Sequence, residues 1–194
     1  MCDPNTTLGC YDKTKALSDG LLLPKAAIKF QTKFYLYTNG FPATSIYYDK
    51  PASISNSHFD GNYDTKIIIH GFGSSSSEQW VHDMKNAFKI KGKFNIILVD
   101  WRHGAEISIS ETLGYSQASI NTRVVGNEVG KLIEALPTNK SKVHLIGHSL
   151  GAHVSSFASK WLIQKSTLFM VKIDHKTPVL QYVVSIATYT SYGV

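Results

Sequence analysis

The sequence has no apolar run long enough to cross a bilayer, because its longest runs, such as Ile67–Ile69, are far shorter than a membrane-spanning helix. We therefore expect no transmembrane segment. The start, Met1–Pro4, leads into polar sequence and lacks the basic and apolar stretches of a signal peptide. The lack of a signal peptide does not decide the cellular compartment, because a sequence can be written from a mature or internal start.

Cysteine is also scarce, with Cys2 and Cys10 as the only two. A loop this tight at a chain terminus predicts a local disulfide in an oxidising compartment, with two free cytosolic thiols as the alternative. Without a second cysteine pair or a metal-spaced histidine pair, we predict no metal site. The glycosylation sequons at Asn5 and Asn139 are weak signals singly, but together with the cysteine pair they favour an extracellular protein.

Acidic residues are fewer than basic ones, which gives a net charge of +6 and a pI of about 9.2. Such a charge suits contact with an anionic surface, with an ordinary solvated basic surface as the alternative. The lysines are scattered, without interleaved aromatic residues or a groove-reading motif, so we expect no nucleic-acid partner.

The 194 residues are enough for one domain with a sizeable core and short for two. From Lys66 onward, short β-rich runs alternate with longer helical patterns, which predicts an α/β fold with a mostly parallel sheet flanked by helices. The expected strands are Thr65–His70, Asn95–Trp101, Lys142–Ile146 and Leu168–Ile173. The first sixty residues predict a strand at Lys33–Thr38, an antiparallel edge and loops.

Three helices are expected between and after these strands. Ser76 and Gln79 form a capping-box pattern before an apolar helical face that runs to Phe88. A long helix over Ser116–Leu136 follows the 3.6-residue period and is stopped by Pro137. A further helix runs from Gly151 to about residue 162.

The pattern G-x-S-x-G, which is typical of a nucleophilic serine, occurs at Gly147, His148, Ser149, Leu150 and Gly151. It lies between a β-run and a helical run, as a nucleophile elbow requires. Glycines are needed there because strand and helix approach closely at a sharp turn. The turn raises the serine hydroxyl at a helix N-terminus, whose dipole favours developing negative charge. We therefore predict Ser149 as an acyl-transfer nucleophile.

Acyl transfer also needs preorganised N–H donors for the oxyanion. The Leu150 amide, directly after the nucleophile, is the first candidate. The segment His70–Gly73 closes the first strand of the alternating region, where the Phe72 amide is placed to be the second.

Together these motifs resemble the pancreatic lipase family of neutral lipases and phospholipases A1, and the resemblance runs from about Cys10 to about Leu162. It implies an α/β-hydrolase fold, Ser149 as nucleophile, and the Phe72 and Leu150 amides as oxyanion donors. It also supports pairing of Cys2 with Cys10. The segments that carry it, in family order, are Lys33–Asn39, Ile69–Phe72, Val99–Trp101, Tyr115–Ala118, Arg123–Gly126 and His144–His153.

In this family the triad aspartate ends the strand after the elbow helix, and Asp174 stands at the equivalent place. Its surroundings depart from the family's Leu-Asp-Pro-Ala pattern, because His175 and Lys176 replace Pro-Ala. An ordinary strand-end aspartate is the alternative.

The order in this fold is Ser, acid, then His, and only His175 follows Asp174. Neighbours on an extended segment point in opposite directions, so His175 is poorly placed between Asp174 and Ser149. The upstream histidines are expected to be surface or strand residues (His58, His82, His103, His144) or local hydrogen-bonding groups of the motifs (His70, His148, His153).

The missing histidine, together with the absence of the family's lid loop, late strands and C-terminal lipid-binding domain, predicts a fragment or truncated splice form. Residues 1–194 would then be one incomplete catalytic domain, weakly active or inactive.

The activity expected of the family is hydrolysis of carboxylic esters in glycerides or phospholipids at a lipid interface, through an acyl-enzyme on Ser149 and without a cofactor. The main alternative is a catalytically silent lipid- or ligand-binding relative, as in yolk-type members. Another kind of α/β-hydrolase, such as a peptidase, is disfavoured by the family landmarks.

Overall fold

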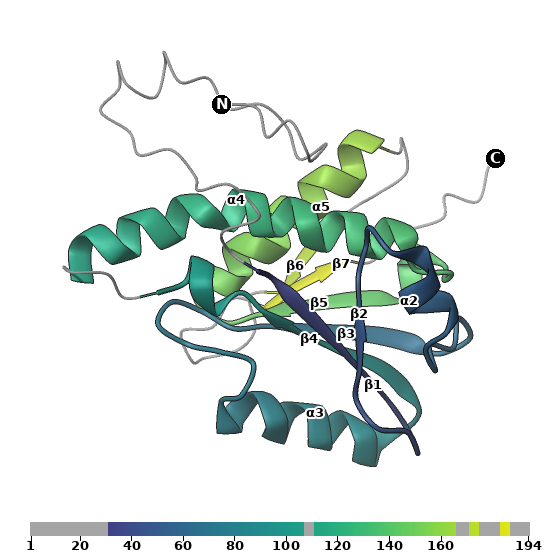
Figure 1. Cartoon of the computed structure of the whole chain (residues 1–194). Helices are drawn as coiled ribbons and strands as arrows, with labels where there is room; N and C mark the ends of the chain where they lie inside the picture. The colour runs from purple at the N-terminus through teal and green to yellow at the C-terminus, as the bar shows by residue number, and fades with distance from the viewer. Residues whose placement is uncertain (1–30, 107–110, 166–170, 175–182, 187–194) are drawn as a thin grey trace.

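The computed structural model describes residues 31–106, 111–165, 171–174 and 183–186 (Figure 1). These residues form three layers, in which a central sheet carries one helix on one face and two helices on the other. The single helix is α3 (Gln79–Lys91), and the pair is α4 (Glu111–Ala135) and α5 (Leu150–Lys165). The chain is therefore an α/β protein. The predicted disulfide, Cys2–Cys10, and the Asn5 sequon lie outside the described residues.

The central sheet has five strands in the order β2-β1-β4-β3-β5. Two of its pairings are parallel, β3 with β4 and β3 with β5, whereas β1 pairs antiparallel with both β4 and β2. The antiparallel edge expected before residue 60 is confirmed, but it makes the sheet mixed rather than mostly parallel. The strands are β1 (Lys33–Thr38), β2 (Thr44–Ile46), β3 (Asp64–Ile69), β4 (Phe94–Asp100) and β5 (Val143–Gly147).

Three short helices connect the main elements. The helix α2 spans Pro51–Ser55, and the two 3₁₀ turns are η2 (Arg102–Gly104) after β4 and η3 (Lys140–Lys142) before β5. Proline at the first position of α2 suits its lack of a backbone N–H, because the first N–H groups of a helix have no acceptor within it.

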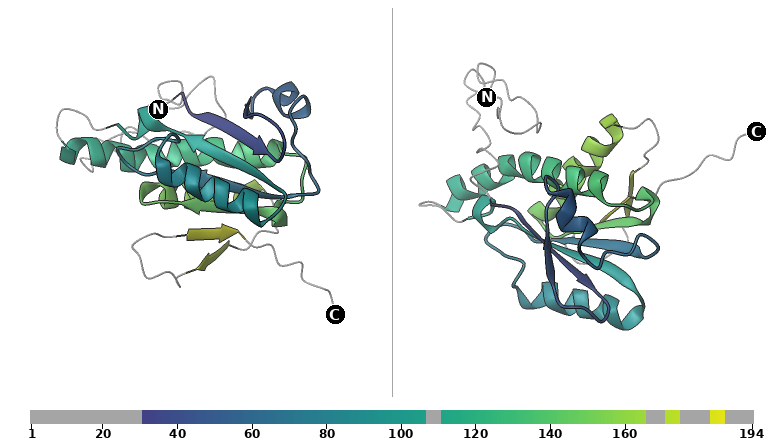
Figure 2. Two further views of the ribbon diagram at one scale, coloured as in Figure 1. Left: turned by 90° about the horizontal axis from the view of Figure 1, so that it is seen from below. Right: turned by 45° about the vertical axis from the view of Figure 1, so that its right-hand side comes forward.

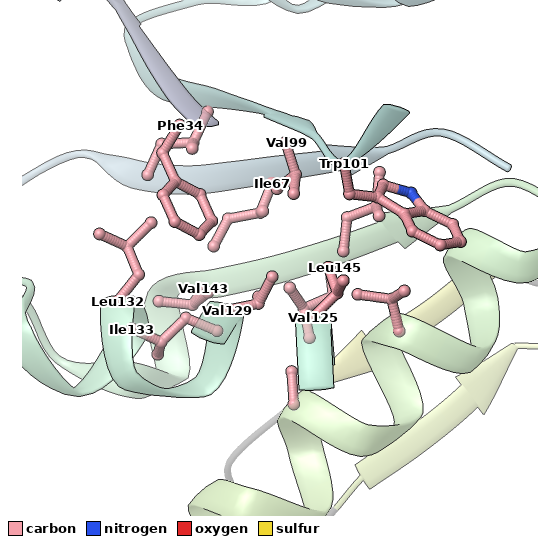
Figure 3. Close-up of a cluster of buried hydrophobic side chains, with 14 of the residues drawn as sticks. Phe34, Ile67, Val99, Trp101, Val125, Val129, Leu132, Ile133, Val143 and Leu145 are labelled. Atoms are coloured by element: carbon pink, nitrogen blue, oxygen red, sulfur yellow. The ribbon is translucent and has the colours of Figure 1, made fainter. Parts of the chain in front are cut away.

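The two faces of the sheet are buried in two separate clusters. Because successive side chains on a strand point to opposite faces, Ile67 and Ile69 face α4 and α5 whereas Ile68 faces α3. Figure 3 shows the larger cluster, in which Phe34 from the sheet side lies near Leu132 and Ile133 of α4. Strands buried on both faces explain why β3 and β4 are continuous apolar runs in the sequence.

The helix starts differ from the sequence predictions in informative ways. Glu78, not Ser76, is the N-cap residue of α3, and no side chain caps this helix, so the predicted capping box is wrong. The Ser76 hydroxyl instead donates to Asp100 at the end of β4. A hydrogen bond to a buried carboxylate is charge-assisted and therefore stronger than the neutral bond that a capping hydroxyl accepts from a backbone N–H.

After α5, the strands β6 (Val171–Asp174) and β7 (Val183–Ile186) pair antiparallel in a sheet of their own. Figure 2 shows this two-stranded pair, whose strand β7 lies close to β5 without joining the hydrogen-bonded central sheet. The predicted fourth strand thus exists but does not join the parallel strands. Antiparallel partners can be linked by a short connection, so two brief neighbouring segments pair with each other readily.

Within the described parts of the chain, no helix is both long and apolar enough to span a membrane.

Candidate active site

Ser149 lies in the sharp turn between β5 and α5 and is exposed to solvent. Its φ is +53°, a left-handed conformation that costs an L-residue roughly 1–2 kcal/mol. Backbone hydrogen bonds hold the turn, from Gly151 N–H to His148 O (2.8 Å) and from Ala152 N–H to Ser149 O (2.9 Å). Strain of this kind persists only where surrounding contacts over-determine the backbone.

The two glycines of the motif lie where strand and helix touch. A Cβ at Gly147 would lie 2.3 Å from the Gly151 carbonyl, and a Cβ at Gly151 would lie 2.3 Å from the Ile69 carbonyl oxygen. Both contacts are with backbone atoms, which cannot rotate away. The close approach expected from the sequence is thus present, and only glycine fits at either position.

The elbow also touches the loop that follows β3. The His148 N–H donates to Ile69 O at 3.0 Å. A Cβ at Gly71 would lie 2.9 Å from the Ser149 Cβ, so the loop backbone passes directly over the serine. Phe72 is the next residue of that loop, and Leu150 is the first residue of α5, whose first-turn N–H groups have no acceptor within the helix. The segments that carry both predicted oxyanion donors are therefore brought to Ser149.

The same loop is tied to the end of β4 through Trp101, which is fully buried. The indole N–H donates to His70 O at 2.8 Å, and the Trp101 backbone N–H donates to His70 Nε2 at 3.0 Å. His70 Nε2 is thus an acceptor, which leaves Nδ1 to donate to Gly71 O at 2.9 Å. The predicted local hydrogen bonding of His70 is confirmed, and both nitrogens of its ring are engaged.

Asp100, the last residue of β4, is buried beside this contact. It accepts from the Ser76 hydroxyl at 2.8 Å and forms an ion pair with the Arg102 guanidinium. Burial alone would raise the pKa of Asp100, but its contacts with His70, Arg102 and Ser76 hold that pKa well below the usual range. Sequence reasoning assigned no role to Asp100, although it stood in the landmark Val99–Trp101.

The described histidines do not form a relay with Ser149. Their ring nitrogens form hydrogen bonds with other residues. His70 pairs with Gly71 and Trp101, His82 pairs with Lys85, and His103 pairs with Glu106. Nδ1 of His148 is buried and has no hydrogen-bond partner among the described residues, contrary to the local bonding expected. The centroid of its ring lies 5.2 Å from that of Trp80.

Apolar rings border the loop over the serine. Phe72 meets Tyr115 of α4 edge-on, with ring centroids 5.3 Å apart, and Tyr115 is 47% exposed. Aromatic pairs of this geometry add about 0.5–1.5 kcal/mol beyond their burial. The rim therefore offers apolar surface next to the serine.

The other predicted residues, Asp174 and Asn139, belong to neither the elbow nor the loop that passes over it. Asp174 ends β6, at the strand position expected, and its side chain lies outside the described residues. Asn139 is exposed and accepts from Ser141 N–H at 3.0 Å. Among the residues that the structure describes, no group of three acidic, histidine or cysteine side chains could hold a metal ion.

Comparison with known proteins places this geometry in a family. The family model described as Lipase matches residues 10–174. The chain is 40% identical over 168 residues to the pancreatic triacylglycerol lipase of Mus musculus, covering 78% of this chain and 35% of the relative. It is 43% identical over 172 residues to the pancreatic lipase-related protein 2 of Cavia porcellus, covering 80% and 37%.

A third relative is named inactive. The inactive pancreatic lipase-related protein 1 of Mus musculus is 40% identical over 167 residues, covering 77% of this chain and 34% of the relative. The chain spans about a third of the length of the relatives it matches, and their names include both active and inactive proteins. The matched family model and these relatives agree, and the chain belongs to the pancreatic lipase family.

Proposed function

We propose that this chain carries the nucleophile and oxyanion site of a carboxylic ester hydrolase with the α/β-hydrolase fold. The observation that supports this most is Ser149 in a strained elbow between β5 and α5, with the loop of Phe72 packed against its Cβ. A serine in that position projects its hydroxyl at a helix N-terminus, next to two segments whose amides can receive negative charge.

In the proposed reaction, the Ser149 oxygen forms a bond to the ester carbonyl carbon, and the carbonyl electron pair moves onto its oxygen. The Phe72 and Leu150 N–H groups stabilise that oxyanion. When the pair returns, the bond to the alcohol breaks, and the alcohol leaves with the proton that Ser149 lost. Water then attacks the acyl-enzyme in the same way and releases the carboxylic acid.

The base that carries this proton is proposed to be a histidine oriented by Asp174, as the family resemblance implies. No described histidine is hydrogen-bonded to Ser149, and His175, the histidine that follows Asp174, lies outside the described residues. Without a base, only about 10³–10⁴-fold catalysis over water persists, from the oxyanion site and binding. We therefore expect turnover to depend on that histidine.

The proposed substrates are triacylglycerols or phospholipids at a lipid interface, with the apolar rim of Phe72 and Tyr115 beside the acyl chain. The triacylglycerol assignment follows the name of one relative. The net charge of +6 suits attraction to an anionic interface. No metal or organic cofactor has a role in this chemistry.

The test is a hybrid protein in which residues 10–174 replace the matching segment of the mouse pancreatic triacylglycerol lipase. A fluorophosphonate should label Ser149 in the hybrid, and Ser149→Ala should abolish the label. Ser77→Ala, which changes an exposed serine of the neighbouring loop, is the matched control and should keep it. Equal labelling of hybrid and Ser149→Ala would contradict the assignment of the nucleophile.

The second candidate function is a catalytically silent lipid-binding relative, which is favoured by the inactive relative at 40% identity. Hydrolysis of a short-chain ester and of a phospholipid by the same hybrid separates the two. A folded hybrid that binds lipid vesicles without turnover would support the silent function, and turnover lost in Ser149→Ala would contradict it.

We also propose that the protein is secreted, with a Cys2–Cys10 disulfide and glycans on Asn5 and Asn139. Mass mapping of non-reduced peptides from secreted material should find the Cys2–Cys10 cross-link and a glycan on the exposed Asn139. Free thiols on both cysteines in that material would contradict the disulfide.

A further inference from the structure

The loop over the serine, residues 71–78, is attached to the end of β4 at several separate points. The Trp101 indole N–H donates to His70 O at 2.8 Å, just before the loop. Gly73 N–H donates to Ala105 O at 2.8 Å, just after η2. The Ser76 hydroxyl donates to Asp100 at 2.8 Å. Among the described residues, Ser76 is the one residue of this loop whose side chain bonds a buried charged group.

Asp100 accepts hydrogen bonds from two residues. Besides the Ser76 hydroxyl, the Arg102 backbone N–H donates to its carboxylate at 3.2 Å, and the Arg102 side chain donates as well. The residue is 3% exposed. A buried carboxylate with this many donors is a strong, fixed anchor, because each charge-assisted hydrogen bond is shorter and stronger than a neutral one.

The loop meets the serine at Gly71 and the anchor at Ser76. Gly71 approaches the Ser149 Cβ so closely that no side chain fits between them. A shift of the loop away from Asp100 therefore changes the height of the Phe72 amide above Ser149. Oxyanion donors have to lie about 2.7–3.1 Å from the developing oxygen, so a small displacement is costly.

We propose that Asp100 and Ser76 are positioning residues that hold the Phe72 amide in place for acyl transfer, through the loop rather than by contact with substrate. This inference rests on the proposed function of Ser149. The sequence around Ser76 contains four consecutive serines, Ser74–Ser77, and the structure singles out one of them.

The serine run supplies its own matched control. Ser76→Ala removes the hydroxyl that reaches Asp100, whereas Ser77→Ala removes an exposed hydroxyl that bonds only Ser75 in the described structure. Both changes leave Asp100, Arg102 and the backbone bonds of the loop intact. Amide hydrogen exchange of residues 71–78 should be faster in Ser76→Ala and unchanged in Ser77→Ala.

The second readout is the rate of fluorophosphonate labelling of Ser149 in the hybrid lipase described above. Ser76→Ala should lower the labelling rate constant at saturating probe about tenfold, the order of effect expected from a misplaced donor rather than a removed one. The concentration for half-saturation should stay the same, because the loop is not proposed to bind the probe's chain. Asp100→Asn should produce a larger fall with the same pattern.

The outcomes are distinguishable. If the unchanged hybrid is not labelled at Ser149, the proposed function fails and the positioning role in that reaction fails with it. If the hybrid is labelled but Ser76→Ala and Ser77→Ala react at the same rate, the positioning role alone is overturned. Faster exchange throughout the protein in Ser76→Ala, instead of in the loop alone, would likewise overturn it, because the hydroxyl would then serve general stability.

Discussion

Asp100 and Glu128 are both buried carboxylates, 3% and 5% exposed, yet their pKa values move in opposite directions. Asp100, at the end of β4, receives a guanidinium, a hydroxyl and a backbone N–H, and its pKa is held well below the usual range. Glu128, on α4, is buried with the neutral hydroxyls of Thr32 and Tyr48 as donors, and burial raises its pKa to about 8.

The difference teaches that burial does not by itself decide the charge of a carboxyl group. Desolvation disfavours the ionised form at both positions, and the donors decide which effect wins. Near the candidate site, Asp100 is a fixed anion that can anchor a loop. Glu128 is instead a protonated acid, and a hydrogen bond of 2.7 Å links it on α4 to Thr32, just before β1.

The largest expected effect comes from replacing each of the two carboxyl groups by its amide, one at a time. Asp100→Asn should destabilise the chain by about 3 kcal/mol, because it leaves the donors of a buried ionised group without their partner. Glu128→Gln should instead stabilise the chain by about 2–3 kcal/mol at pH 7, because the folded wild-type chain holds a proton on Glu128 that the unfolded chain has already lost. Urea denaturation at pH 7 measures both. Equal losses would show that the two carboxylates do not differ in charge.

A pH titration sharpens the comparison for Glu128. Its folded pKa of about 8 lies above its unfolded value, so the folded state holds an extra proton between roughly pH 4.5 and 8. Stability should therefore fall as pH rises through that window. Between pH 6 and 7.5 the unchanged chain should lose about 2 kcal/mol relative to Glu128→Gln. Parallel stability curves for the two proteins would contradict the raised pKa.

The same linkage has the opposite sign for Asp100. Its folded pKa is depressed, so its contribution is present above the unfolded value of about 3.9 and is lost as pH falls below it. Asp100→Asn should remove this acid-side loss of stability.

A smaller effect is expected from the guanidinium that faces Asp100. The Arg102 side chain is 47% exposed, so solvent screens its charge. Arg102→Gln should cost about 1 kcal/mol, since the Ser76 hydroxyl and the Arg102 backbone N–H still reach Asp100. Raising the salt concentration should shrink the difference between the two proteins. A cost as large as that of Asp100→Asn would show that the ion pair, not the set of donors, keeps Asp100 ionised.

The smallest change concerns the hydroxyl that meets Glu128. Thr32→Val keeps the shape of the side chain and removes one hydrogen bond, so it should cost about 0.5 kcal/mol at pH 6. It should also raise the pKa of Glu128 further, because that hydrogen bond lowers it. Thermal denaturation at pH 6 and pH 8 measures both effects. An increased stability at both values would contradict the role of Thr32.

The sequence by itself determined the local features of this protein. The apolar runs at Ile67–Ile69 and Asn95–Trp101 predicted β3 and β4. A strand that is buried on both faces is a continuous apolar run in the sequence, without alternating polar residues. The G-x-S-x-G pattern located the turn at Ser149, because only glycine fits where Gly147 and Gly151 touch the backbone. Such features depend on a few consecutive residues and their preferences.

Only the tertiary structure decided what depends on partners distant in sequence. Nothing near Ser76 in the chain indicates Asp100, 24 residues later, and the capping box predicted from local spacing was wrong for that reason. The fold likewise decided that β1 pairs with β4 and not with β3, although β3 comes between them in the sequence. The opposite charge states of Asp100 and Glu128 are of the same kind, since a pKa depends on the donors that folding brings together and not on the residue type.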